Sequence, residues 1–148
     1  MRVLSLTQPW ASLICLGAKK FETRSWKSWY IGPLLVHASK AYPRWAKELE
    51  KDDPFYSALR AHGTYDPGLS CGYIIGHVEL VRCPRTEDIR DSLDEKELAF
   101  GDFGDGRFAW QLEMPAFLPK PILAKGALGL WEFDLYEHYS VLASEQAR

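Results

Sequence analysis

Short segments bounded by glycine and proline constrain the fold of this chain more than any other feature of its sequence. The 148 residues include 11 glycines and 9 prolines, which divide the apolar patterns into short pieces. Strand-like patterns occupy six segments: residues 2–6, 20–25, 34–38, 72–81, 107–113 and 129–135. About six strands with short helices between them predict an α+β fold. We expect a small mixed β-barrel with short helices packed at its ends, rather than a Rossmann-like parallel sheet.

The predicted helices are short as well. Pro9 in the first turn and Gly17 as a left-handed stop predict a helix that ends at residue 16. Residues 43–60 are expected to form two short helices, and residues 62–70 a loop rich in glycine and proline. Three prolines are expected to make an extended connection after the fifth strand: Pro115, Pro119 and Pro121.

The length and composition indicate one globular domain. We place this domain at residues 1–135 and expect residues 136–148 to be a tail or a short docked helix. No apolar run approaches the roughly 18 residues of a membrane span, so no membrane partner is expected. The three cysteines are odd in number and lack C-x-x-C spacing. Reduced thiols and a cytoplasmic location are therefore predicted.

Charge and tryptophan are concentrated in the first third of the chain. Residues 1–45 carry seven basic side chains and one acidic one, although the whole chain has a net charge of -2, and they hold four of the six tryptophans. Cations can meet phosphates while flat rings stack on unpaired bases, so this pattern suits a nucleic-acid site. The alternative is a buried set of tryptophans with a solvated basic rim. Composition alone favours that alternative, because large aromatic side chains are usually well buried.

The richest polar cluster lies at residues 17–26. On a strand, Lys20, Glu22 and Arg24 point to one face, while Phe21 and Thr23 point to the other. Glu22 would then orient the guanidinium of Arg24 toward an anion or a base edge. Lys19 could reach the same anion or base as a mobile positive charge, in a cleft that the strand would line. The alternative interpretation is an edge strand kept soluble by its charges.

The motifs around this cluster resemble those of the ASCH domain family, named for activating signal cointegrator homology. The resemblance begins with Ser5-Leu6-Thr7-Gln8-Pro9-Trp10 and continues with Gly17-x-Lys19-x-x-Glu22-x-Arg24-Ser25-Trp26. It extends through Leu35-Val36-His37-Ala38-Ser39-Lys40 and Phe108-Ala109-Trp110 to Gly126-x-Leu128-Gly129-Leu130-Trp131. These motifs lie in the expected order over residues 3–133, and they fit the compact bacterial and phage-type members.

The resemblance implies a PUA-like fold whose cleft binds RNA or single-stranded DNA, often through an unpaired or modified base. The binding residues that it suggests here are Gln8, Trp10, Lys19, Arg24, Ser25, Trp26, Ser39, Lys40 and Arg107. Among these, the cations would contact phosphates, and Trp10 or Trp26 would stack on a base. Sequence offers no indication of a protein partner.

An enzymatic branch of the family supplies the alternative function. Some small ASCH-like proteins resemble amidohydrolases that act on acylated cytidine, with a threonine nucleophile at the position of Glu22 and a lysine at that of Lys19. Other relatives are described as ribonucleases. This chain has Glu22 instead, so a hydrolase would need Lys19 and Glu22 as an acid/base pair, assisted by Arg24. A nucleoside would then be the small-molecule ligand.

No cofactor or metal is predicted. Glu97, Asp102 and Asp105 lie near one another in the sequence but lack the regular spacing of a calcium loop. The histidines and cysteines show no zinc spacing either.

Overall fold

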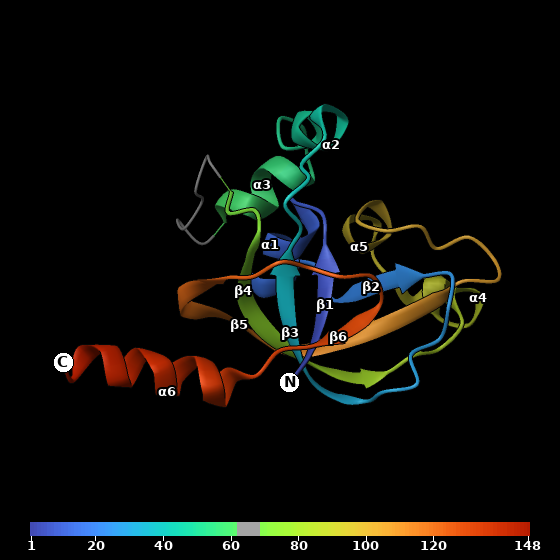
Figure 1. Ribbon diagram of the computed structural model, residues 1–148. Helices are drawn as coiled ribbons and strands as arrows, with labels where there is room; N and C mark the ends of the chain where they lie inside the picture. The colour runs from blue at the N-terminus through green and yellow to red at the C-terminus, as the bar shows by residue number, and fades with distance from the viewer. Residues whose placement is uncertain (62–68) are drawn as a thin grey trace.

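Six strands form one curled mixed sheet in the order β2-β5-β4-β3-β1-β6 (Figure 1). The computed structural model describes residues 1–61 and 69–148, so most of the loop expected at residues 62–70 lies outside them. The strands are β1 (Arg2–Leu6), β2 (Phe21–Arg24), β3 (Gly32–Ala38), β4 (Tyr73–Arg82), β5 (Phe108–Leu123) and β6 (Leu130–Glu132). The helices are α1 (Trp10–Cys15), α2 (Arg44–Leu49), α3 (Phe55–Arg60), α4 (Thr86–Ile89), the 3-10 helix η1 (Arg90–Ser92), α5 (Glu95–Ala99) and α6 (Leu135–Gln146).

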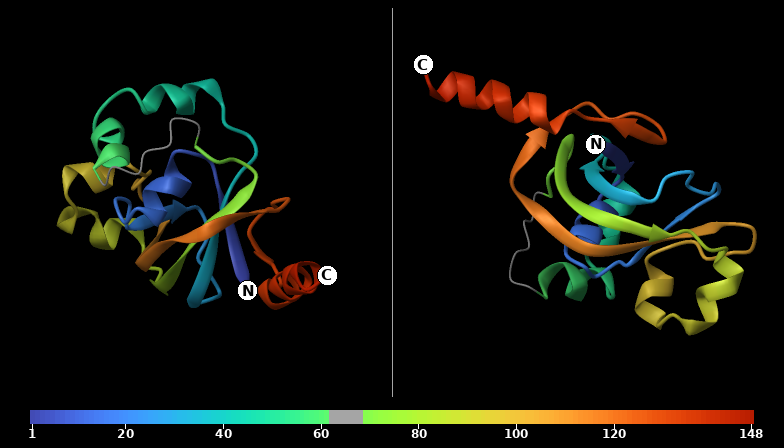
Figure 2. Two further views of the ribbon diagram at one scale, coloured as in Figure 1. Left: turned by 90° about the vertical axis from the view of Figure 1, so that its left-hand side faces the viewer. Right: turned by 90° about the horizontal axis from the view of Figure 1, so that it is seen from below.

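The pairing of the strands confirms the predicted mixed sheet. β1 and β3 run parallel, while the other neighbouring pairs are antiparallel. The long strands β4 and β5 bend along their length and curl the sheet into a half-barrel (Figure 2). Three register irregularities in the β4–β5 pairing accompany this bend, since a bulge increases the local twist of a strand.

The main core lies between the sheet and α1. Ile14 and Cys15 of α1 belong to the same buried cluster as Leu4 and Val36 of the parallel strands, and the fully buried Trp110 completes it. Gly17 has φ +81°, which confirms the left-handed stop after α1 because glycine adopts this conformation without steric cost. The chain can therefore turn directly from the helix into β2, the edge strand that carries the polar cluster.

The proline-rich segment is a strand, so its assignment as a connection was wrong. β5 continues without interruption from Phe108 to Leu123 and includes Pro115, Pro119 and Pro121. β2 pairs only with residues 108–111 of β5, so no strand in the described part of the chain pairs with the rest of that edge of β5. Proline lacks a backbone N–H, and it is tolerated on an unpaired edge because no ladder bond is lost there.

The last helix, α6, extends beyond the sheet (Figure 1). None of its twelve residues is buried, although Leu135 at its start packs against a core cluster. In the described ranges, no helix is both long enough and apolar enough to cross a bilayer.

A buried histidine connects β3 to the segment before β6. Nε2 of His37 donates to the carbonyl oxygen of Ala124 at 2.8 Å, so Nδ1 accepts from the Ser5 hydroxyl at 2.9 Å. Nε1 of Trp131 donates in turn to the Ser5 oxygen at 3.0 Å. Burial lowers the pKa of His37 below its ordinary value, and the hydrogen bond to Ala124 opposes this shift only in part.

We expect the free energy of unfolding to decrease as the pH falls below about 6.5, the ordinary pKa of histidine. Between that value and the lowered pKa of His37, the unfolded chain binds more protons than the folded protein, so acidification favours unfolding. Denaturant unfolding between pH 5 and pH 8 measures the effect. His37→Gln keeps a donor and an acceptor but does not titrate, so this variant should show a flatter profile. An unchanged profile in the variant would contradict the assignment.

Candidate functional site

A cleft of about 490 Å³ opens where β1 and β3 end. Because these strands are parallel, their carboxyl ends meet at one edge of the sheet, beneath α2 (Figure 1). Its lining residues come from the end of β1, the start of α1, β2, the end of β3 and the loop after α5: Ser5, Leu6, Thr7, Trp10, Glu22, Thr23, Arg24, Ser39, Ala99, Phe100, Gly101 and Asp102. The cleft is therefore assembled from segments that are distant in the sequence.

An ion pair on β2 forms one wall of the cleft. Nε and Nη2 of Arg24 donate to Oε2 of Glu22 at 3.1 and 2.9 Å, and Nη2 also donates to the carbonyl oxygen of Ser5 at 3.1 Å. The side chain of Arg24 is 26% exposed and that of Glu22 is 13% exposed. Within the described part of the chain, Nη1 of Arg24 has no hydrogen-bond partner. The guanidinium therefore has a fixed orientation, and its Nη1 donors are available to a ligand.

Lys19 lies beneath this ion pair and not on the surface of the cleft. Its side chain is fully buried, with Nζ donating to the carbonyl oxygen of Phe100 at 2.8 Å and lying 3.8 Å from Oε1 of Glu22. Burial lowers the pKa of Lys19 below its ordinary value, and the nearby carboxylate of Glu22 opposes the shift. In this position Lys19 supports the cleft wall but presents no charge to a phosphate in solvent.

The loop at residues 100–102 packs closely against Lys19 and Thr23. The backbone N–H of Asp102 donates to Oγ1 of Thr23 at 3.1 Å. A Cβ on Gly101 would lie 3.2 Å from the same oxygen and 3.4 Å from Nζ of Lys19, so only glycine fits here without displacing its neighbours. Residues 100–106 contain three glycines, but nothing in their sequence marks them as a wall of the cleft.

The side chain of Glu97, in the helix that precedes this loop, bonds to the backbone just before β2. Its Oε1 accepts from the backbone N–H of Lys20 at 2.6 Å. Its Oε2 is buried and has no hydrogen-bond partner among residues 1–61 and 69–148. Burial raises the pKa of Glu97 above its ordinary value, and the hydrogen bond from Lys20 opposes the increase. The carboxyl group therefore connects α5 to the residue before β2, and with it the loop to the polar strand.

Trp10 forms the aromatic side of the cleft, and Trp45 lies next to it outside the lining. Trp10 lies in its lining, and the ring of Trp45 is 5.8 Å from the Trp10 ring at an interplanar angle of 49°. Trp10 also meets the ring of Phe55 edge-on at 6.1 Å, which anchors it to α3. Trp45 is 64% exposed. Trp45 is not among the binding residues expected from the sequence, because residue 45 reaches this place only through the position of α2.

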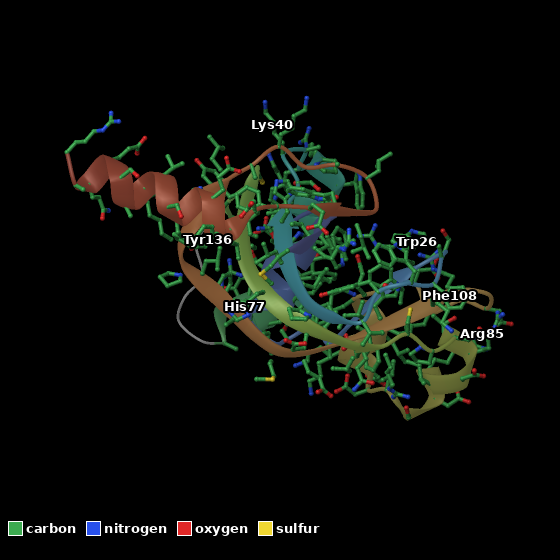
Figure 3. The ribbon with its side chains drawn as sticks, turned by 60° about the horizontal axis from the view of Figure 1, so that its bottom comes forward. Trp26, Lys40, His77, Arg85, Phe108 and Tyr136 are labelled. Atoms are coloured by element: carbon green, nitrogen blue, oxygen red, sulfur yellow. The ribbon has the colours of Figure 1, made fainter. Side chains whose placement is uncertain are left out.

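Two of the selected residues are engaged in the protein interior. The Gln8 side chain is fully buried; Nε2 donates to Oγ of Ser12 and the carbonyl oxygen of Ser70, and Oε1 accepts from the Ser12 backbone. Trp26 packs edge-on against Trp110 at 4.8 Å, outside the cleft lining. Figure 3 shows Trp26 well separated from Lys40, near Phe108 and Arg85. Neither side chain is placed to contact a base in the cleft.

The remaining selected residues lie at or near the rim. Ser39 lines the cleft, and Lys40 follows it with an exposed side chain. Ser25 is exposed just after β2. Arg107 donates to the carbonyl oxygens of Asp102 at 3.1 Å and Thr23 at 3.3 Å, so it stabilises the wall from outside. The structure thus brings together Trp10, Glu22, Arg24 and Ser39 in one lining, with Lys19 beneath them.

The described residues contain no group of three histidine, cysteine, aspartate or glutamate side chains arranged to hold a metal ion. Cys15, Cys71 and Cys83 are all free thiols. The cleft lining offers the Glu22–Arg24 ion pair, the carboxylate of Asp102, hydroxyl groups and aromatic rings.

Comparisons with known proteins place these features in a family. The sequence profile of the ASCH domain matches residues 4–142. Activating signal cointegrator 1 from Homo sapiens and its counterpart from Mus musculus are each 26% identical to the chain over 136 residues, or 91% of its length. The aligned region is 22% of either relative, so the chain spans about a fifth of these longer proteins.

The fold also matches solved structures. The crystal structure of ASCH from Zymomonas mobilis aligns with a TM-score of 0.56 over 96% of this chain and 93% of that one, at 13% identity. A mutant form of the same protein gives a TM-score of 0.55. At this identity the likeness concerns the fold alone. Together with the profile match over nearly the whole sequence, it establishes that the chain belongs to the ASCH domain family, with that family's PUA-like fold.

Proposed function

We propose that the cleft binds one unpaired base of single-stranded RNA or DNA. The observation that carries this proposal is the presence of the Trp10 ring and the fixed Arg24 guanidinium in the lining of one cleft. An aromatic ring offers a stacking surface to any base. A guanidinium with free donors can bind a base edge or a phosphate. Pockets of about 300–1,000 Å³ commonly take small organic groups, and the volume of about 490 Å³ lies within that range.

The charge distribution supports a local, single-stranded ligand. The chain as a whole carries a formal charge of -2, which disfavours extended binding along a duplex, since that depends on many phosphate contacts. A base inside a duplex is stacked and paired, so it cannot enter a cleft without being extruded. An unpaired base meets no such cost. We therefore expect single strands to bind more tightly than duplexes of the same sequence.

Fluorescence anisotropy with labelled ten-nucleotide RNA and DNA, single-stranded and duplex, tests the proposal. We expect saturable binding of single strands that weakens from 50 to 200 mM salt, and affinities for the duplexes at least about tenfold lower. Displacement of the labelled strand by an unlabelled one provides the control for binding to the dye. Absence of saturable binding, or equal affinity for duplex and single strand, would overturn the proposal.

The hydrolase remains the second candidate because Glu22, a lining carboxylate 3.8 Å from Nζ of Lys19, could act as a general base. The buried ammonium group of Lys19 donates to the carbonyl oxygen of Phe100. In a hydrolase it would therefore influence the charge of Glu22 and would not contact the substrate. Incubation with N-acylated cytidine and with RNA separates the two functions. Turnover that disappears in Glu22→Gln would favour the hydrolase, whereas binding without turnover is the outcome that we expect.

A further inference from the structure

The exposed ring of Trp45 extends the aromatic side of the cleft onto α2. Its centroid is 5.8 Å from that of Trp10, which lies in the lining, yet Trp45 itself is 64% exposed and outside the lining. Exposure of a large ring costs free energy because apolar surface remains in water. A tilted pair with one member inside the cleft and the other just outside it gives two successive stacking surfaces.

Basic residues lie before and after this exposed ring in the sequence, and the acidic Glu48 and Glu50 follow them. Residues 40–47 include three cations, Lys40, Arg44 and Lys47, and no acidic residue. Lys40 and Arg44 are exposed and form no ion pair with any described residue. Nζ of Lys47 lies 5.4 Å from the ring of Tyr42. Lys40 directly follows Ser39 of the lining, so the charges begin at the rim and continue to Lys47 in α2.

We infer that a bound strand continues out of the cleft across Trp45, which stacks on a second nucleotide while Arg44 contacts its phosphate. This inference rests on the proposed function, and it defines the ligand as a polynucleotide and not a free nucleoside. Single-strand-binding proteins combine aromatic rings for successive bases with a cationic path for the backbone. Trp10, Trp45 and the segment 40–47 supply both components on one side of the molecule.

The chain contains a matched control for the exposed ring. Trp29 is 67% exposed, close to the value for Trp45. The guanidinium of Arg2 lies 4.5 Å from the Trp29 ring, and no residue of this pair belongs to the cleft lining. Loss of Trp29 therefore removes an equally exposed tryptophan without touching the inferred path of the strand.

Calorimetric titration with a nucleoside 5′-monophosphate and with the corresponding trinucleotide tests the inference, for adenine and uracil in turn. The wild-type protein should bind the trinucleotide at least about tenfold more tightly than the monophosphate. Trp45→Ala should lower trinucleotide affinity about tenfold and leave monophosphate affinity within twofold. Trp29→Ala should change neither affinity.

Each contrary outcome has a distinct meaning. If the trinucleotide binds no more tightly than the monophosphate, the inference is overturned while the proposed function stands, and Trp45 is then free to serve a protein partner. If Trp45→Ala weakens both ligands equally, Trp45 acts only by supporting Trp10, which also overturns the inference. Failure of the wild-type protein to bind either ligand overturns the proposed function itself.

The salt dependence provides an independent test of the phosphate contact. For single strands, each phosphate contact contributes about 0.7 to the slope of log affinity against log salt. Arg44→Gln should therefore flatten the trinucleotide slope by about 0.7 and leave the monophosphate slope unchanged. An unchanged trinucleotide slope would overturn the assignment of a phosphate to Arg44.

Discussion

Replacing Arg24 with alanine is expected to weaken single-strand binding by roughly 10- to 100-fold, since hydrogen bonds to charged groups contribute about 1.5–3 kcal/mol each. The variant loses the free donors at Nη1. It also leaves the Glu22 carboxylate in the cleft without its closest cation, which now lies 2.9 Å away. The exposed negative charge should repel a phosphate backbone. Anisotropy titration with a labelled single strand measures the loss directly.

Two further variants show whether the effect belongs to the site. Arg85→Ala removes the same charge from a side chain that is 57% exposed and lies over the Phe108 ring, away from Lys40 (Figure 3); its affinity should stay within twofold of wild type. Arg24→Lys keeps the charge but lacks the planar fork that grips Glu22, so it should recover only part of the affinity. Equal losses of single-strand affinity in Arg24→Ala and Arg85→Ala would mean that Arg24 contributes only through its positive charge and not through its position in the cleft.

The largest loss of stability is expected from Lys19→Met. Methionine has nearly the same length and fills the buried space, but it cannot donate to the Phe100 carbonyl or balance Glu22. Removal of one partner from a buried ion pair costs about 3–5 kcal/mol. Because Glu22 is 13% exposed and keeps Arg24, we expect the lower end of this range, about 3 kcal/mol in the free energy of unfolding. Urea denaturation at pH 7 measures the change.

The neighbouring lysine is the control for this prediction. Lys20 is exposed, and its contact with Glu97 uses the backbone N–H, which a substitution retains. Lys20→Met should therefore alter the free energy of unfolding by less than about 0.5 kcal/mol. If the two variants are equally stable, the buried ammonium does not contribute as the geometry indicates. Single-strand affinity of refolded Lys19→Met should fall as well, because the 100–102 loop loses its anchor.

The strand pattern and the polar cluster were predictable because they depend on local rules. Alternation on β2 places Glu22 and Arg24 on one face, and their hydrogen bonds confirm this expectation. Gly17 likewise ends α1 where the sequence indicates, with φ +81°. Such features follow from residues only a few positions apart. They required no knowledge of what packs against them.

The roles of single residues were less predictable because they depend on distant segments. Lys19 was expected at the cleft surface, yet the 100–102 loop covers it. Trp10 or Trp26 was expected to stack on a base, yet Trp26 packs on Trp110 of β5. Trp45 was not selected, although α2 places it beside Trp10. Whether an aromatic ring or a cation is exposed is determined by its neighbours in space, which alternation along one strand does not reveal.

By itself, the sequence determined the family, the number of strands and the composition of the polar strand, since these are written in short motifs and local periodicity. Only the tertiary structure decided which groups share the cleft. β1 and β3 end at the same edge because they pair in parallel. The loop after α5 reaches the cleft through contacts with Lys19 and Thr23 across about eighty residues of sequence. Those contacts arise from the packing of the sheet, and no segment encodes them alone.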